Sequence, residues 1–272
     1  MKRRILPGFN LSLGYSLTYL GLIVLLPLAA LAWKASGLGL GGLIELLRVP
    51  RTLSALKLSF GGATLAAAIN VVVGLLVAWV LVRYRFPGRR LLGALVDLPF
   101  ALPTAVAGIA LTAVYANTGW VGKPAATLGL QLAYNPVGVV IALTFIGLPF
   151  VVRTVEPVLA DMGHGLEEAA ATLGARRWTI FRRVILPEIS PAIVTGFALA
   201  FARGVGEYGS VIFIAGNMPF KSEISPLLIV TKLEEYDYAG ATAIATVLLL
   251  ASLILLLLIN VWQGRELRRR SA

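Results

Sequence analysis

The chain has 272 residues, of which 58% are hydrophobic and only 14% are charged, about half the charged share of a typical soluble domain. These figures exclude a disordered chain and argue against an ordinary soluble enzyme. Cysteine is absent and there is one histidine, which excludes disulfides, thiolate chemistry and a conventional zinc site, while the net charge of +11 leaves nucleic-acid binding open until the charges are located.

Six apolar segments are each about the roughly 20 residues that a helix needs to cross a bilayer. They are long, rich in Leu and Ala, and lack the alternation of a membrane β-barrel. With no internal repeat and no long linker, the sequence predicts an all-α integral membrane protein with one domain, residues 1–272. The predicted transmembrane helices are 11–33, 58–82, 91–116, 136–152, 191–215 and 239–262.

The first predicted span, 11–33, leaves one alternative open. Its basic start and the sequence Ala30-Leu31-Ala32 are compatible with a cleaved signal peptide. However, its apolar stretch is longer than the roughly 7–15 residues of a signal peptide. We therefore expect it to be retained, interrupted only by Pro27.

Several residues indicate where spans begin and end. Asn135-Pro136 and Ser190-Pro191 each pair a good N-cap residue with a proline at the first helical position. Gly216 is placed to end the fifth span. The third span carries Pro99 and Pro103 within its predicted length.

The distribution of Lys and Arg predicts the orientation. One set of segments, at residues 2–4, 83–90, 153–183 and 265–270, holds 16 of them, and the alternate set holds 7. Because cytoplasmic loops are enriched in Lys and Arg, both termini are expected in the cytoplasm. The topology thus explains the positive charge, and nucleic-acid binding loses its support.

The longest cytoplasmic loop, residues 153–190, is amphipathic. Leu166–Leu173 is predicted to be a short helix that Gly174 ends in a left-handed cap. A second helix is predicted over Arg176–Leu186, closed by Pro187. This helix pair could lie on anionic lipid with its arginines at the headgroups, or it could dock a partner through its smooth alanine face.

The residues of this loop resemble the EAA motif of binding-protein-dependent ABC importers, E-A-A-x3-G-x9-I-x-L-P, with Val184 in place of the isoleucine. In that family the short helix couples the permease to a cytoplasmic ATPase subunit. The resemblance implies this role for six residues, namely Glu168, Ala169, Ala170, Gly174, Leu186 and Pro187.

Three further segments narrow the resemblance. They read DLPFALPTAVAGIAL from Asp97, FARGVGEYGSVIFIAGNMP from Phe201 and EISPLLIVTKLEEYDYAGATAIA from Glu223. Together they resemble the T-type permease subunits of sulfate/thiosulfate importers. The resemblance implies a type I (MetI-like) permease fold in the inner membrane, a W-type second permease subunit, two ATP-binding subunits and a periplasmic sulfate-binding protein. A permease for molybdate or tungstate, and a homodimer, remain alternatives.

Three charged residues, Asp97, Arg203 and Glu207, lie within predicted spans, where a charge costs on the order of 3 kcal/mol unless it is paired or hydrated. Arg203 and Glu207 are four residues apart and share a helix face. Two interpretations stay open: a packing ion pair, or a face of the pathway where Arg203 offers positive charge to a dianion. Asp97 is expected to be structural, by satisfying the proline break or by binding Arg203.

No catalytic motif accompanies these charges. The sequence has no G-x-x-x-x-G-K-[ST], G-x-S-x-G or H-E-x-x-H, and the lone His164 is expected to be solvated. We therefore expect no enzyme activity, metal or cofactor in this chain, with ATP and Mg²⁺ bound by partner subunits. An intramembrane enzyme or an assembly factor is the disfavoured alternative.

Overall fold

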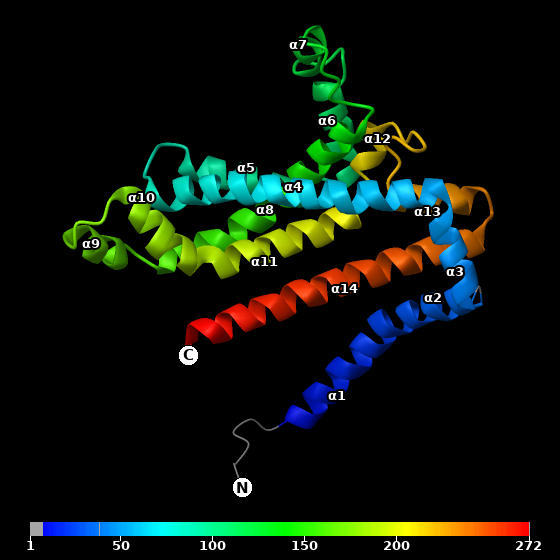
Figure 1. Ribbon diagram of the computed structural model, residues 1–272, viewed down its shortest axis with the longest axis horizontal. Coiled ribbons are helices and arrows are strands. Elements are labelled where there is room, and N and C mark those ends of the chain that lie inside the picture. The colour runs from blue at the N-terminus through cyan, green and yellow to red at the C-terminus, as the bar shows by residue number, and fades with distance from the viewer. Residues whose placement is uncertain (1–7, 38, 272) are drawn as a thin grey trace.

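The computed structural model describes residues 8–37 and 39–271, and the described chain is built from helices (Figure 1). In chain order they are α1 (Phe9–Leu20), the π-helix η1 (Gly21–Leu25), α2 (Leu26–Ser36), α3 (Gly39–Arg48), α4 (Pro50–Arg83), α5 (Arg89–Ala101), α6 (Thr104–Tyr115), α7 (Gly122–Thr127), α8 (Pro136–Asp161), α9 (Gly165–Thr172), α10 (Arg177–Ile180), the π-helix η2 (Phe181–Ile185), α11 (Leu186–Val205), α12 (Val211–Ala215), α13 (Ser225–Glu234) and α14 (Tyr238–Ser271).

The described chain has five helical segments that are long and apolar enough to cross a membrane, and a bent pair, α5 and α6, that makes a sixth if it is counted as one span. The all-α, membrane-spanning fold expected from the sequence is therefore confirmed. The five segments are Phe9–Lys34, Pro50–Arg83, Pro136–Asp161, Arg177–Val205 and Tyr238–Ile259.

The third predicted span, 91–116, is not one continuous helix. Its two halves, α5 and α6, meet at an angle of 114°. Leu102 is extended (φ −84°, ψ 136°), as expected for a residue before a proline, because the ring of Pro103 disfavours helical geometry at that position. Pro99, in contrast, lies inside α5.

The fifth predicted span, 191–215, is also wrong in detail. The helix ends at Val205 and resumes only as the short α12, which Gly216 ends in the left-handed conformation (φ 72°) as expected. Its start is earlier than predicted as well, because Ser190-Pro191 lies within α11. The Ser190 hydroxyl donates to the Pro187 carbonyl (3.0 Å), the acceptor that Pro191 leaves without a helical N–H.

Two prolines sit within continuous helices just after π-helical segments. A proline ring clashes with the carbonyl four residues earlier. For Pro27 and Pro187 these carbonyls belong to Ile23 and Arg183, inside η1 and η2. The wider π turn makes room for the ring, so the helix continues. The expectation that Pro187 closes the loop helix is therefore wrong: α10, η2 and α11 form one segment.

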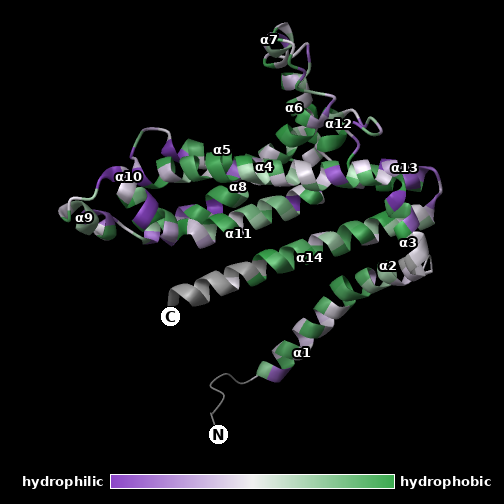
Figure 2. Ribbon diagram, in the orientation of Figure 1, coloured by the Kyte–Doolittle hydropathy of each residue, from purple (hydrophilic) through white to green (hydrophobic). Residues whose placement is uncertain are grey.

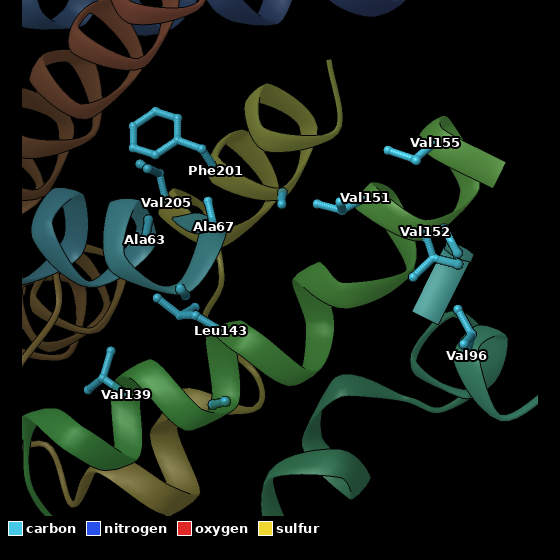
Figure 3. Packing of buried hydrophobic residues seen from close by; sticks show 14 of the residues in the cluster. Ala63, Ala67, Val96, Val139, Leu143, Val151, Val152, Val155, Phe201 and Val205 are labelled. Carbon is cyan, nitrogen blue, oxygen red and sulfur yellow. The ribbon is translucent and has the colours of Figure 1, made fainter. Parts of the chain in front are cut away.

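The core lies where α4, α8 and α11 pack together, and small residues let their backbones approach closely. A Cβ on Gly74 of α4 would lie 2.9 Å from the Val151 side chain of α8, and one on Gly196 of α11 would lie 2.8 Å from the Val151 Cα. Figure 3 shows the side chains that fill this centre. They include Ala63, Ala67, Leu143, Val152, Phe201 and Val205.

The long helices consist mostly of hydrophobic residues (Figure 2), and many of their large apolar side chains are exposed. Large side chains such as Leu76 (62% exposed) and Leu257 (53% exposed) point outward. In a protein surrounded by water, so continuous an apolar surface would be unusual. It is the surface expected of helices that face lipid or neighbouring subunits.

The bundle has two distinct ends. Helices α9 and α10 lie at one end, and α3 and α13 lie at the other, while α6 and α7 project sideways (Figure 1). The start of α1 and the end of α14 point toward the α9 end. Helices α4, α8 and α11 lie between these two ends.

Candidate functional site

The loop between α8 and α10 forms the short helix predicted from its sequence. Helix α9 is bracketed by two glycines with positive φ, Gly163 (+60°) and Gly174 (+80°). The N–H of Gly174 donates to Ala171 and that of Ala175 donates to Ala170, which satisfies carbonyls at the end of the helix. The backbone thus requires glycine at position 174, because an L side chain is strained there.

Helix α9 presents most of its motif residues outward. Glu168, Ala169 and Gly174 are exposed, while Ala170 packs toward the core. Leu173 (88% exposed) and Trp178 (69% exposed) add large apolar surface beside them. The result is a protruding face of small and apolar side chains at the end of the bundle, which suits contact with a protein groove better than burial within this chain.

Leu186 and Pro187, the other two motif residues, lie elsewhere. They begin α11 directly after η2, so they do not extend the exposed face of α9. His164, which was expected to be solvated, is exposed, and its Nδ1 lies 3.1 Å from Nη1 of Arg83.

Arg203 and Glu207 form an ion pair across the end of α11. Arg203 Nη1 lies 2.5 Å from Glu207 Oε2. The other oxygen of Glu207 accepts from the backbone N–H (2.9 Å) and the hydroxyl (3.0 Å) of Ser210. Glu207 is buried, whereas 37% of the Arg203 side chain is exposed. The carboxylate therefore anchors the break between α11 and α12, while the Arg203 side chain remains partly exposed.

The break is held tightly against α6. A Cβ on Gly108 of α6 would lie 2.8 Å from the Ser210 Cα, and a Cβ on Gly209 would collide with Thr104. Glycines at these two positions allow the halves of the third and fifth predicted spans to touch. The two broken helices thus meet at Gly209 and Ser210, close in sequence to Glu207.

Asp97 has a partner that sequence reasoning missed. In α5 it binds Arg153 of α8 through two bonds, Nε to Oδ1 (2.8 Å) and Nη2 to Oδ2 (2.5 Å). Arg153 also binds Glu156 and the Gly93 carbonyl. Asp97 therefore binds neither Arg203 nor the backbone at Pro103 here. Arg153, counted with the cytoplasmic loop, lies inside α8, and a pair 56 residues apart leaves no local signal.

Two other ion pairs join distant parts of the chain. Arg83, at the end of α4, binds Glu167 of α9. Arg51, at the start of α4, binds Glu223 through two bonds of 2.8 and 2.6 Å. From the sequence these arginines entered only the count of loop charges, because nothing in their spacing identifies their partners.

The family described as "Binding-protein-dependent transport system inner membrane component" matches residues 70–271. The chain is 51% identical over 267 residues to the Sulfate transport system permease protein CysT of Escherichia coli (strain K12), covering 98% of this chain and 96% of that protein. It is also 51% identical over 245 residues to the Probable sulfate transport system permease protein cysT of Nephroselmis olivacea, covering 90% of this chain and 86% of that protein.

Solved structures agree on the fold. A chain of a bacterial ABC transporter involved in the import of alginate aligns with a TM-score of 0.75 at 18% identity, covering 94% of each chain. A chain of the MetNI methionine ABC transporter, in an inward-facing conformation, aligns with a TM-score of 0.54 at 22% identity, covering 83% of this chain and 97% of that chain. At these identities the likeness concerns the fold alone.

Proposed function

This chain belongs to the family of binding-protein-dependent transport system inner membrane components, and on that basis we propose that it is a permease subunit of an ABC importer for sulfate or thiosulfate. The observation that carries the proposal is the 51% identity over 98% of the chain to a sulfate permease. It favours sulfate over the molybdate and tungstate alternatives. A dianion that crosses the hydrocarbon region must replace its hydration with other polar groups, so the proposal requires a polar route.

The proposed complex contains subunits that supply what this chain lacks. Two cytoplasmic subunits bind ATP and Mg²⁺, since this sequence has no phosphate-binding loop. A periplasmic sulfate-binding protein delivers the anion. A second, W-type permease subunit completes the membrane part, and the apolar outer surface of the bundle provides area for it as well as for lipid.

We assign docking of an ATPase subunit to α9. Its exposed residues Glu168 and Ala169 offer a carboxylate beside a small apolar patch, and Leu173 protrudes next to them. This chemistry favours a protein groove over anionic lipid, because a carboxylate at the tip would be repelled by lipid phosphates. The basic residues Arg176 and Arg177 lie nearer the bundle and suit the headgroup region.

We assign the exposed side of Arg203 to the anion pathway. Glu207 is anchored by Ser210, so the pair keeps its position while the Arg203 side chain remains partly exposed. The break between α11 and α12 also leaves backbone groups outside regular helix. Broken helices of this kind offer N–H donors to anions at membrane depth.

The proposed orientation places α9 and both termini in the cytoplasm. The support is the excess of Lys and Arg in the segments assigned to that side and the common direction of α9, the start of α1 and the end of α14 (Figure 1). In this orientation Glu223 and α13 lie at the periplasmic end.

The direct test is uptake in a strain that lacks this subunit and carries it on a plasmid. We expect the chain to restore uptake of labelled sulfate or thiosulfate. Labelled molybdate serves as the control substrate, and uptake of molybdate alone would replace the proposed substrate with the alternative. Failure with all three anions, while the protein is inserted in the membrane, would contradict the proposed function.

A further inference from the structure

Arg83 joins the end of α4 to the docking helix through several groups at once. Only 8% of its side chain is exposed. Its Nη1 donates to the Gly163 carbonyl at 2.9 Å and lies 3.1 Å from His164 Nδ1, and its Nη2 donates to the Glu167 carboxylate. A partly buried guanidinium that binds a carboxylate and a carbonyl in a fixed geometry is among the stronger polar contacts in proteins.

Aromatic side chains reinforce this connection from the other side. Trp79, one turn before Arg83, lies under its guanidinium at 5.5 Å. Trp79 also packs edge-on against Phe181 of η2 at 6.0 Å, and Phe181 stacks with Trp178 of α10 at 5.5 Å. The last turn of α4 therefore contacts the chain both before and after the glycine turn at residue 174. The docking helix cannot shift far without moving this turn.

Helix α4 is well suited to carry such a shift. It runs unbroken for 34 residues, and its one proline, Pro50, is at the first helical turn, where proline is tolerated. By helical rise, Arg51 and Arg83 are about 48 Å apart. At the far end, Arg51 binds Glu223, and Ser59 accepts a 2.7 Å hydrogen bond from the Ser225 backbone. Both partners are buried, in the segment that follows α12.

We propose that α4 is a rigid connection between the docking helix and the opposite end of the bundle, with Arg83 as the positioning residue that ties α9 to it. The Arg51–Glu223 ion pair joins the segment that follows α12 to the other end of α4. Closure of the ATPase subunits on α9 would then reach the far end through α4. This inference rests on the proposed function, because it requires docking at α9.

The test measures sulfate imported per ATP hydrolysed by the full complex in proteoliposomes. We expect Arg83→Gln and Glu167→Gln each to lower this ratio at least fivefold, while the ATPase subunits still copurify with the permease. The charge-swapped pair Arg83→Glu with Glu167→Arg should recover at least half of the ratio. Arg85→Gln is the matched control, because Arg85 is an exposed arginine that lies just beyond the end of α4.

A second arm keeps the test informative if Arg83 variants assemble poorly. Since the chain has no cysteine, Arg83→Cys with Glu167→Cys creates its only two thiols. A reducible bifunctional thiol reagent that spans them should restore the ratio, and dithiothreitol should remove the restoration. Loss of import on cross-linking would overturn the proposal, because it would mean that the connection must open during the cycle.

Different results would contradict the proposed function in sulfate import and the proposed role of α4 with Arg83. If the unmodified complex does not import sulfate, the proposed function fails before any variant is tested. If the unmodified complex imports sulfate and Arg83→Gln and Glu167→Gln keep its ratio within twofold, only the role of α4 and Arg83 is overturned.

Discussion

Neutralising Arg203 should damage the protein more than neutralising Glu207, although they form one ion pair. Glu207 is buried and keeps only the two donors of Ser210 when Arg203 is replaced. Arg203 has 37% of its side chain exposed and can reach polar surroundings when Glu207 is replaced. The difference in burial therefore sets the order of the two effects.

The magnitudes follow from that difference. Breaking a buried pair and leaving a charge behind costs about 3–5 kcal/mol. Because Ser210 still donates two hydrogen bonds to Glu207, we expect Arg203→Gln to destabilise the protein by about 3 kcal/mol, the lower end of this range. Glu207→Gln preserves an oxygen acceptor for Ser210 and should cost about 1 kcal/mol. The double variant leaves no buried charge, so we expect about 2 kcal/mol in total and a coupling free energy of about 2 kcal/mol.

The assay is equilibrium unfolding of the purified complex in mixed micelles, with the two single variants and the double variant compared in one cycle. The matched control is the exposed pair of Lys232, in the last turn of α13, with Glu235, which caps that helix; their coupling free energy should stay below about 1 kcal/mol. Additive effects at Arg203 and Glu207 would show that the two charges are not coupled, and a larger loss for Glu207→Gln than for Arg203→Gln would show that burial does not set the order of the effects.

Variants of α9 and of the contact between α8 and α11, together with reporter fusions in the loops, give three further tests. Gly174→Val should abolish sulfate uptake without preventing membrane insertion, because a side chain in the left-handed backbone at φ +80° costs about 1–2 kcal/mol. Gly165→Ala, with open space around its Cβ, is the control and should leave uptake unchanged. Normal uptake by Gly174→Val would count against coupling through α9. Gly196→Ala should lower the yield of assembled complex severalfold, because its Cβ would press on the Val151 backbone, whereas Gly61→Ala should not lower the yield. Equal yields of the two variants in a solubilisation assay would show that α8 and α11 are not so closely packed. Reporter fusions should be active in the periplasm at one set of sites and in the cytoplasm at the other, and reversal at any two sites would overturn the orientation. The sites are Lys34, Lys123 and Lys221 against Arg89 and Arg269.

Sequence patterns predicted the helical, membrane-spanning fold because length and hydropathy alone decide whether a helix can cross a bilayer. They also placed the helix at residues 166–173 and the cap at Gly174, since both depend on local backbone preferences. The N-cap at Asn135 is confirmed, as its side chain accepts from the N–H groups of Val137 and Gly138.

Prolines were the main source of error. Pro103 ends a helix, while Pro187 and Pro191 do not, although all three follow helical sequence. The difference depends on whether the carbonyl four residues earlier can move or find another donor. At Pro187 a π turn makes room, and at Pro191 the Ser190 hydroxyl supplies the donor. Neither compensation can be read from residue propensities.

The partners of charged residues were predicted only where they are near in sequence. Arg203 and Glu207 are four apart, and the structure pairs them. Asp97 with Arg153, Arg83 with Glu167 and Arg51 with Glu223 are separated by at least 56 residues, so their pairing depends on how the helices assemble. The polar contacts around α9 therefore leave no signal in the local sequence.

Reconstitution can show whether this chain forms the sulfate pathway of an ATP-driven importer. The complex is assembled in proteoliposomes with and without this chain, with ATP and the ATPase subunits on one face and sulfate-loaded binding protein on the other. We expect ATP-dependent sulfate movement away from the binding protein only when this chain is present, with no competition from excess molybdate. Equal sulfate movement without the chain, or movement that molybdate abolishes, would contradict this expectation.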